Sequence, residues 1–189
     1  MLESDARLPS VVSLVAGKAI RGSWWGHPSG GAVYSESNKL ADRTDVVVLK
    51  LLNGKVTFVL DTLWAHVYAV GTCGEPWQMT GLRLPSQRLL GLVRRNGLIR
   101  TDDPRSRLAA GPRVSSAALD LERSLLVLGA QVHTESGRHA KSLESWPHWA
   151  RRIKLASRMP AARAKAELAE RVRRLNVEFN GDARLPWPT

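Results

Sequence analysis

The densest group of residues able to bind a ligand is the block RGSWWGHP at residues 21–28. Its two glycines allow the backbone to approach a bound molecule closely. Its paired indoles offer faces on which nucleic-acid bases stack, and its arginine offers a fork that fits phosphate. Its histidine supplies an imidazole that can donate or accept a hydrogen bond. We therefore predict a ligand-binding role for Arg21, Ser23, Trp24, Trp25 and His27.

The alternative for this block is a structural role, in which the indoles fill the junction between two lobes and a backbone carbonyl satisfies His27. Neighbouring residues of an extended segment point to opposite sides of the chain. We therefore expect one of Trp24 and Trp25 to face the core and the other to face a ligand. The block lacks the glycine pattern of a P-loop or of a dinucleotide-binding turn.

A second group of polar residues surrounds a predicted β-hairpin at residues 126–146. His133 and His139 come close across its antiparallel strands, with Glu135 in the turn. These three residues could flank a substrate, but no HExxH-type spacing supports a zinc site, so we expect no metal and no cofactor. Contacts of the hairpin with solvent or phosphate are our first expectation, and acid–base chemistry is the alternative. Neither Ser23 nor Ser136 lies in a nucleophile elbow, which disfavours a hydrolase.

The elements that position these residues predict an α+β protein of two small lobes, in which helices combine with short antiparallel hairpins. The N-terminal lobe, residues 1–76, has one hairpin, whose strands are joined by Asn53-Gly54. Asn-Gly suits a two-residue turn because both of its residues need positive φ. The predicted strands are 46–52 and 55–59, and the predicted helices are 8–20, 29–42 and 61–70.

The second lobe, residues 77–149, has the element order of a winged helix, which is a helix-turn-helix followed by a β wing. A helix at 86–95 precedes a loop or short helix at 101–112 and a third helix that Ser115 or Ser116 caps. The hairpin 126–146 is the wing. Residues 150–189 form a basic C-terminal helix and tail, and we expect the apolar stripe that begins at Leu168 to pack this helix back on the body.

Positive charge is concentrated in two blocks of the chain. The sequence has 28 Lys and Arg against 17 Asp and Glu, a net charge of +11. Residues 79–113 and 146–189 each carry +6, whereas residues 1–78 are neutral and residues 114–145 carry −1. Such blocks predict sequence-independent binding to nucleic acid, because cations that neutralise phosphates release counterions; a merely solubilising surface is the alternative. The predicted contacts are Arg88, Arg94, Arg95, Arg100, Arg105, Arg107, Arg113, Arg138, Lys141, Arg151 and Arg152.

The third helix of the second lobe lacks the side chains that usually read bases. It offers Asp120, Glu122 and Arg123, whereas base reading relies on Arg, Lys, Asn and Gln. The arginines of the first helix, of the 100–113 segment and of the tail would therefore carry the binding, which implies recognition of backbone and shape. This composition disfavours a sequence-specific transcription factor.

On residues 21–28 and 132–141 the sequence resembles an uncharacterised family of small bacterial proteins, which share an RGSWWxHP block, a GKVTFV hairpin (residues 54–59 here) and a VHTESGxHAK wing. The layout of the second lobe is also similar to winged-helix modules of bacterial DNA-repair proteins, including the crosslink-repair DNA glycosylases. This resemblance implies DNA binding. It implies no catalytic residue, because the paired-glutamine motif of those glycosylases is missing from this sequence.

Composition narrows the location and the partners. No apolar run is long enough to cross a bilayer, and Glu3 and Asp5 stand where a secretory signal has basic residues, so we expect no membrane partner. The single cysteine, Cys73, fits a reducing cytoplasm. We therefore predict a cytoplasmic, non-sequence-specific nucleic-acid-binding protein, with DNA favoured over RNA and DNA repair as its setting. Two alternatives remain: an enzyme acting on a nucleic acid or nucleotide, with its pocket at residues 21–27 and 133–139, and a protein-interaction module.

Overall fold

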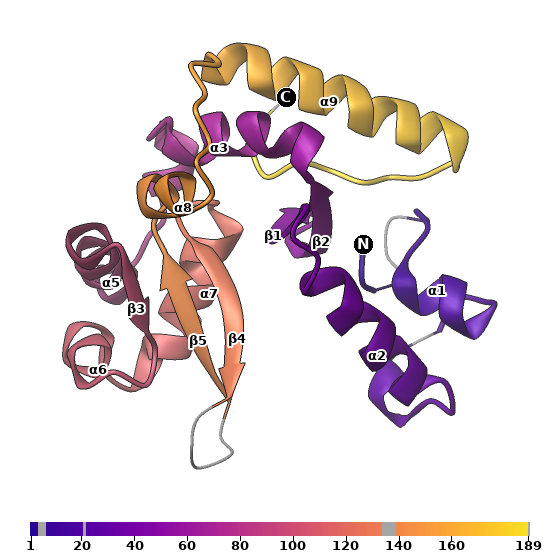
Figure 1. The fold of residues 1–189 in the computed structure, drawn as a ribbon, viewed down its shortest axis with the longest axis horizontal. Helices are drawn as coiled ribbons and strands as arrows, with labels where there is room; N and C mark the ends of the chain where they lie inside the picture. Colours follow the sequence, from indigo (N-terminus) through magenta and orange to yellow (C-terminus); the bar gives the residue numbers. More distant parts are fainter. Residues whose placement is uncertain (4–6, 21, 134–138, 189) are drawn as a thin grey trace. The chain divides into compact units, whose positions relative to one another are not determined.

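The computed structural model describes residues 1–3, 7–20, 22–133 and 139–188, and the side chains of His133 and His139 are not described. The chain is a mixed α+β protein with two small antiparallel sheets and a long C-terminal helix, which confirms the predicted fold class (Figure 1). It divides into two compact units. Unit 1 comprises Met1–Trp64 and Ala162–Pro186, and unit 2 comprises Ala65–Ala161 and Trp187–Thr189.

The sheet of unit 1 is the predicted hairpin of β1 (Val46–Leu52) and β2 (Lys55–Leu60). Asn53 and Gly54 have φ of 52° and 66°, as a two-residue turn of this kind requires. Val47 pairs with Val59 and Leu49 with Thr57, and all four side chains are buried. The hairpin therefore buries one of its faces, and Phe58 on the other face packs against the cluster of Val11, Val12, Trp24 and Val33.

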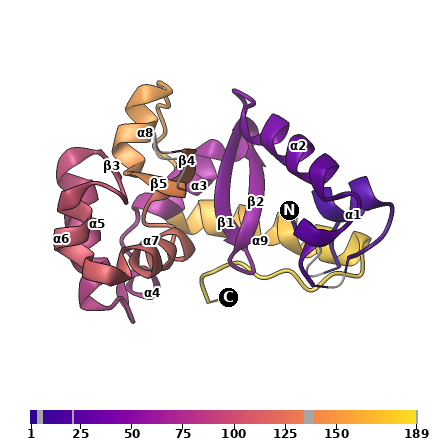
Figure 2. The same ribbon diagram turned by 90° about the horizontal axis from the view of Figure 1, so that it is seen from below.

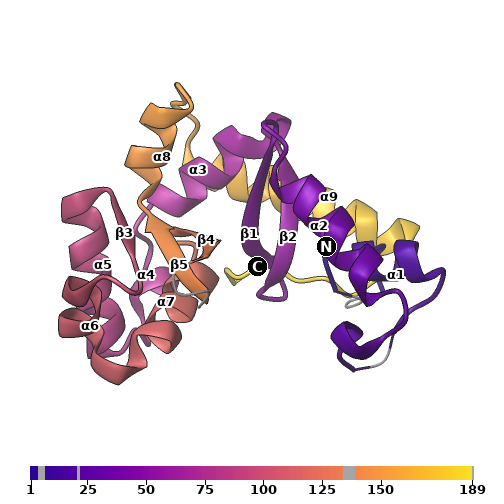
Figure 3. The same cartoon turned by 60° about the horizontal axis from the view of Figure 1, so that its bottom comes forward.

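Two helices and a short 3₁₀ turn complete the N-terminal part of unit 1 (Figure 3). They are α1 (Val11–Ala16), the 3₁₀ turn η1 (Trp24–Gly26) and α2 (Gly30–Ala41). Ser10 and Ser13 form a capping box that starts α1, which is shorter than the predicted helix 8–20 because Gly17 ends it with φ 71°. Val11, Val12, Trp24 and Val33 form the buried cluster between these elements.

The C-terminal helix α9 (Ala161–Glu178) belongs to unit 1 from Ala162 onward. Ala164 and Leu168 on this helix are buried, whereas Leu175 and Phe179 at the far end of the predicted stripe are exposed. The segment that follows α9 pairs with the hairpin turn: Asn53 N–H donates to the Arg184 carbonyl over 2.9 Å, and Arg184 N–H donates to Asn53 Oδ1 over 2.7 Å. The predicted packing of this helix against the body is confirmed for its first half.

Unit 2 contains the sheet of three strands in the order β3-β5-β4, all antiparallel. The chain passes through two helices, α3 (Trp64–Thr72) and α4 (Pro76–Met79), before α5 (Leu84–Asn96) leads into the sheet region. The other elements are β3 (Leu98–Arg100), α6 (Pro104–Ala110), the 3₁₀ turn η3 (Gly111–Arg113), α7 (Val114–Arg123), β4 (Leu128–His133), β5 (His139–Glu144) and α8 (Trp146–Arg152). Helices α5, α6 and α7 pack on one another and bury an aliphatic core together with the sheet (Figure 2).

Three local predictions for this region were wrong. Strand β3 was missed, since its three residues are too few to show an alternation. The second strand of the hairpin ends at Glu144 instead of continuing to residue 146, because Pro147 cannot donate to a ladder but suits the first turn of α8. Ser115 and Ser116 do not cap α7, because η3 already winds the chain and α7 begins at Val114.

A tryptophan fills the centre of unit 2. Trp146 is 1% exposed, and its indole N–H donates to the Leu125 carbonyl over 2.7 Å. The ring lies directly over Gly71 of α3: a Cβ on Gly71 would stand 2.1 Å from Trp146 Cε2. Glycine at this position therefore allows the helix to approach the ring.

Candidate nucleic-acid interface

Most of the net charge of the chain belongs to unit 2. Its segments contain fifteen Lys and Arg against seven Asp and Glu, a net +8 of the total +11. Whether these cations can meet an external anion depends on which of them the acidic residues of the unit already neutralise.

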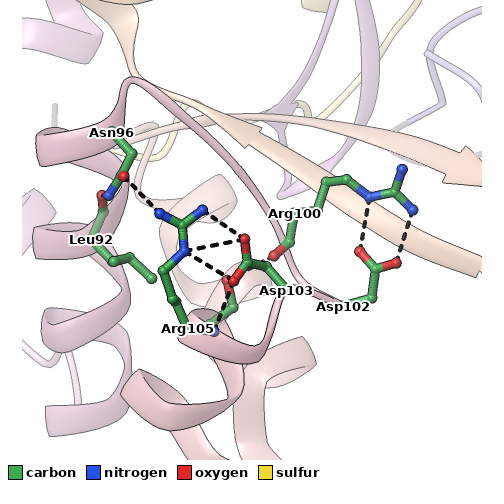
Figure 4. Close-up of polar contacts among 7 residues, drawn as sticks. Leu92, Asn96, Arg100, Asp102, Asp103 and Arg105 are labelled. Atoms are coloured by element: carbon green, nitrogen blue, oxygen red, sulfur yellow. Dashed lines mark hydrogen bonds and ion pairs between the residues drawn. The ribbon is translucent and has the colours of Figure 1, made fainter.

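Two of the predicted contacts are held by neighbouring aspartates (Figure 4). Arg100, at the end of β3, donates to both carboxylate oxygens of Asp102 over 2.9 and 2.8 Å. Arg105, in α6, forms the same fork with Asp103 over 3.1 and 2.8 Å and also donates to Asn96 Oδ1 over 3.1 Å. These pairs hold the pKa values of Asp102 and Asp103 below their usual range, chiefly through the arginine hydrogen bonds. Arg100 and Arg105 therefore add little net charge to the surface.

Lys141 is directed inward from β5. Its ammonium donates to the buried carboxylate of Glu122 on α7, and its backbone N–H donates to Thr101 Oγ1 over 2.9 Å. Gly129 makes room for the pair, because a Cβ there would lie 2.0 Å from Glu122 Oε1. The pair borders a shallow hollow of about 130 Å³ lined by Thr101, Ser115, Gln131, Ala140 and Lys141. The role of Lys141 in this structure is to neutralise a buried acid.

Arg152 is also paired within unit 2. It donates to both oxygens of Glu144 over 3.0 and 2.8 Å, and His148 Nδ1 lies 2.7 Å from Glu144 Oε1. Burial raises the pKa of Glu144, but the hydrogen bonds from Arg152 and His148 outweigh burial, so its pKa is below the usual range. This cluster connects the end of β5 to α8.

The remaining cations of unit 2 are exposed. Among the residues that the structure describes, ten of them have no carboxylate oxygen within 4.0 Å: Arg83, Arg88, Arg94, Arg95, Arg107, Arg113, Arg123, Arg151, Lys154 and Arg158. Six of these were predicted contacts. Arg83, Arg123, Lys154 and Arg158 were not included in that set, although Arg83, Lys154 and Arg158 belong to the two positive blocks. Arg138 lies outside the described residues.

Six of these exposed cations lie at the start of α5, within α5, or in the α6–η3 segment that precedes α7. Arg88 and Arg95 lie seven residues apart, on one face of α5, and Arg95 Nη1 is 3.5 Å from the position of a Cβ on Gly91 between them. Arg83, which precedes α5, and Arg113 of η3 line the same small hollow, so these two arginines lie close together.

The two acids of α7 differ in their surroundings. Glu122 is buried against Lys141. Asp120 is half-buried, accepts a hydrogen bond from Ser86 Oγ of α5 over 2.9 Å, and lines the hollow that Arg83 and Arg113 also border. The exposed positions of α7 are Ser115, Ser116 and Arg123, so the helix offers no asparagine or glutamine with which to read bases.

The RGSWWGHP block lies in unit 1, and its two tryptophans differ sharply in burial. Trp24 is 7% exposed and belongs to the core, whereas Trp25 is 66% exposed. The prediction that one of the two rings faces the core is confirmed, and the ligand-facing role of the other remains a prediction. The predicted cause was wrong, because the segment is the 3₁₀ turn η1 and not an extended strand, and the rings stack with centroids 4.2 Å apart. His27 Nδ1 accepts a hydrogen bond from Ser29 N–H over 3.1 Å, and Ser23 is exposed. Arg21 lies outside the described residues.

The wing residues are only partly described. The backbone register pairs His133 with His139 as predicted. Glu135, Ser136 and Arg138 lie outside the described residues. Within the described ranges, no group of three or more His, Cys, Asp and Glu residues is placed to hold a metal ion. The helices described in the structure include none that combines the length and the apolar character needed to cross a membrane.

No protein-family model, curated protein or solved structure matches this chain. The chain is a mixed α+β protein of two units. In the described part of unit 2, some cations pair with acids of the same unit, and a group of exposed arginines with one lysine does not pair with them.

Proposed function

We propose that this protein binds nucleic acid, DNA in preference to RNA, through the phosphate backbone and without reading sequence. The observation that carries the proposal is the separation of the cations of unit 2 into two sets. Four are neutralised by acids of the same unit, and ten remain exposed and unpaired among the described residues. A surface that served solubility alone would not need this separation.

Exposed arginines bind phosphates by direct pairing and by releasing the counterions condensed on the nucleic acid. Each phosphate contact lowers the slope of log affinity against log salt by about 0.7–0.9. Ten exposed cations carry enough positive charge to contact several phosphates, so we expect a steep salt dependence.

The arrangement of unit 2 supports this proposal. A helix, a strand, two helices and two strands follow one another, and β3 pairs with β5 at the edge of the sheet. We infer a winged-helix layout from this order of elements; in a winged helix the second helix of the helix-turn-helix and the wing approach DNA. Because α7 exposes only two serines and one arginine, we infer that it contacts the phosphate backbone and responds to DNA shape rather than reading the bases. DNA repair, which needs binding at many sequences, is the setting that we propose.

The test compares two double variants that lose the same formal charge. Arg94→Gln with Arg95→Gln removes unpaired cations from the last turn of α5. The matched control, Arg173→Gln with Arg174→Gln, removes two cations of α9 that are each 2.7 Å from Glu170. We expect the first variant to bind several unrelated DNA sequences more weakly, to the same extent for each, and to lose about 1–2 from the salt slope.

The control should retain the affinity and slope of the wild type. Thermal melts of both variants establish that the fold is intact. An absence of binding at about 50 mM salt, or binding that does not respond to salt, would contradict the proposal. An equal loss in both double variants would show that net charge alone, and not the unpaired set, determines binding.

A further inference from the structure

Trp25 is exposed in a chain that otherwise covers its tryptophans. All seven tryptophans lie in the described part of the chain, and Trp24, Trp146, Trp149 and Trp187 are buried. Trp25, in contrast, exposes 66% of its surface. Tyr34 of α2, 42% exposed, lies beside it with ring centroids 5.7 Å apart and a tilt of 44°. Unit 1 thus presents two neighbouring aromatic rings to solvent.

The exposed indole is held in place from the inside. Trp24 covers it as a stacked ring, at 4.2 Å and 22°, and Trp24 is itself fixed in the core by Val11, Val12 and Val33. Because Trp24 lies against one face of Trp25, the opposite face and the edges account for the exposure. A ring that is already positioned loses little conformational freedom when a ligand stacks on it.

The backbone around the two rings is equally constrained. His27 N–H donates to the Trp24 carbonyl over 3.1 Å, and Gly30 N–H donates to the His27 carbonyl over 2.7 Å. A Cβ on Gly30 would lie 2.9 Å from the Trp24 carbonyl oxygen, so the first residue of α2 packs tightly on the turn that carries the rings. Helix α2 also supplies Tyr34, and this close packing sets its distance from Trp25.

We propose that Trp25, supported by Trp24 and flanked by Tyr34, is a stacking platform for an unpaired base of a nucleic-acid strand. The inference rests on the proposed function, because the exposed cations of unit 2 select a polyanion as the ligand of the chain. Exposed aromatic rings combined with cations are the means by which proteins bind single strands without sequence preference, since every base offers a π face. The platform therefore extends the ligand from a phosphate backbone to a strand with unpaired bases.

The experiment measures binding to two oligonucleotides of equal length, oligo-dT and an abasic oligomer that keeps the phosphates but lacks the bases. We expect the wild-type chain to bind oligo-dT roughly 5- to 150-fold more tightly, the range for one stacked base. Trp25→Ala should abolish this preference and keep the salt-dependent affinity for the abasic oligomer. Trp25→Phe, which keeps an aromatic face, should retain part of the preference.

Leu14→Ala is the matched control, since Leu14 is another exposed apolar side chain of unit 1 (73%) and carries no ring. It should keep the full preference. Equal, salt-dependent binding of both oligomers by the wild type would overturn the platform and leave phosphate binding standing, with a protein partner then the occupant of the exposed rings. A preference that survives Trp25→Ala would also overturn it. Failure to bind either oligomer while duplex DNA is still bound would overturn the platform, whereas failure to bind both the oligomers and duplex DNA would refute the proposed function itself.

Discussion

Replacing each of the two adjacent tryptophans by alanine should give very different stabilities. Trp24→Ala removes a ring that is 7% exposed and packs on Val11, Val12 and Val33. Burial of this extent gives a loss of about 3–5 kcal/mol in the free energy of unfolding. Trp25→Ala removes a ring that is 66% exposed, so its main loss is the stacked contact with Trp24, worth about 0.5–1.5 kcal/mol.

The change in melting temperature that a given loss of stability causes depends on the size of the unit that unfolds. Unit 1 has 64 residues in its first segment and 25 in its second, 89 in all. In a domain of this size each kcal/mol lowers Tm by roughly 4–8 °C. Trp24→Ala should therefore lower the Tm of unit 1 by about 12–40 °C, whereas Trp25→Ala should lower it by only about 2–12 °C.

Thermal unfolding followed by far-ultraviolet circular dichroism measures both variants, and denaturant titration provides a second estimate of each free-energy change. Trp25→Phe is the control, because it keeps an aromatic ring at the exposed position. Equal losses of stability in Trp24→Ala and Trp25→Ala would refute the assignment of one ring to the core and the other to the surface. The platform proposed above would then lose its structural basis.

Two further predictions concern unit 2. Gly71→Ala should destabilise the unit by roughly 3 kcal/mol, since its Cβ would stand 2.1 Å from Trp146 Cε2. As a control in unit 1, Gly31→Ala in α2, whose Cβ meets nothing within 4 Å, should be neutral or slightly stabilising in the same denaturant titration. The lowered pKa of Glu144 means that its stabilising contribution is complete above the unfolded value of about 4.3 and is lost as pH falls through the folded value. Glu144→Gln should therefore destabilise the protein at pH ~7, and its difference from the wild type should shrink as the pH is lowered to ~3; a difference independent of pH would contradict this linkage.

Several features could be predicted from the sequence because they depend on neighbouring residues. Asn53-Gly54 determines the hairpin of unit 1, since its two positive φ values are available within the dipeptide itself. The long C-terminal helix follows from an alanine-rich segment with ion pairs spaced for a helix, such as Arg174 with Glu170. The net charge and the position of its two blocks are likewise properties of the sequence alone.

Contacts between distant residues decided what the sequence left open. Strand β3 exists because residues 98–100 pair with 142–144, more than forty positions away, and three residues carry no periodicity of their own. Lys141 was predicted to contact nucleic acid, but on β5 it is paired with Glu122 of helix α7, and no local pattern shows that pair.

The two tryptophans show both kinds of information: what the sequence contains and what only tertiary packing decides. Their chemistry and their adjacency are evident in the sequence, and adjacency already suggested that only one could be buried. Which one is buried depended on the 3₁₀ turn and on the cluster of Val11, Val12 and Val33, residues that lie before and after the block in the chain. Tertiary packing selected Trp24 for the core, because only its ring reaches the apolar space between α1 and α2, and it thereby left Trp25 exposed to solvent.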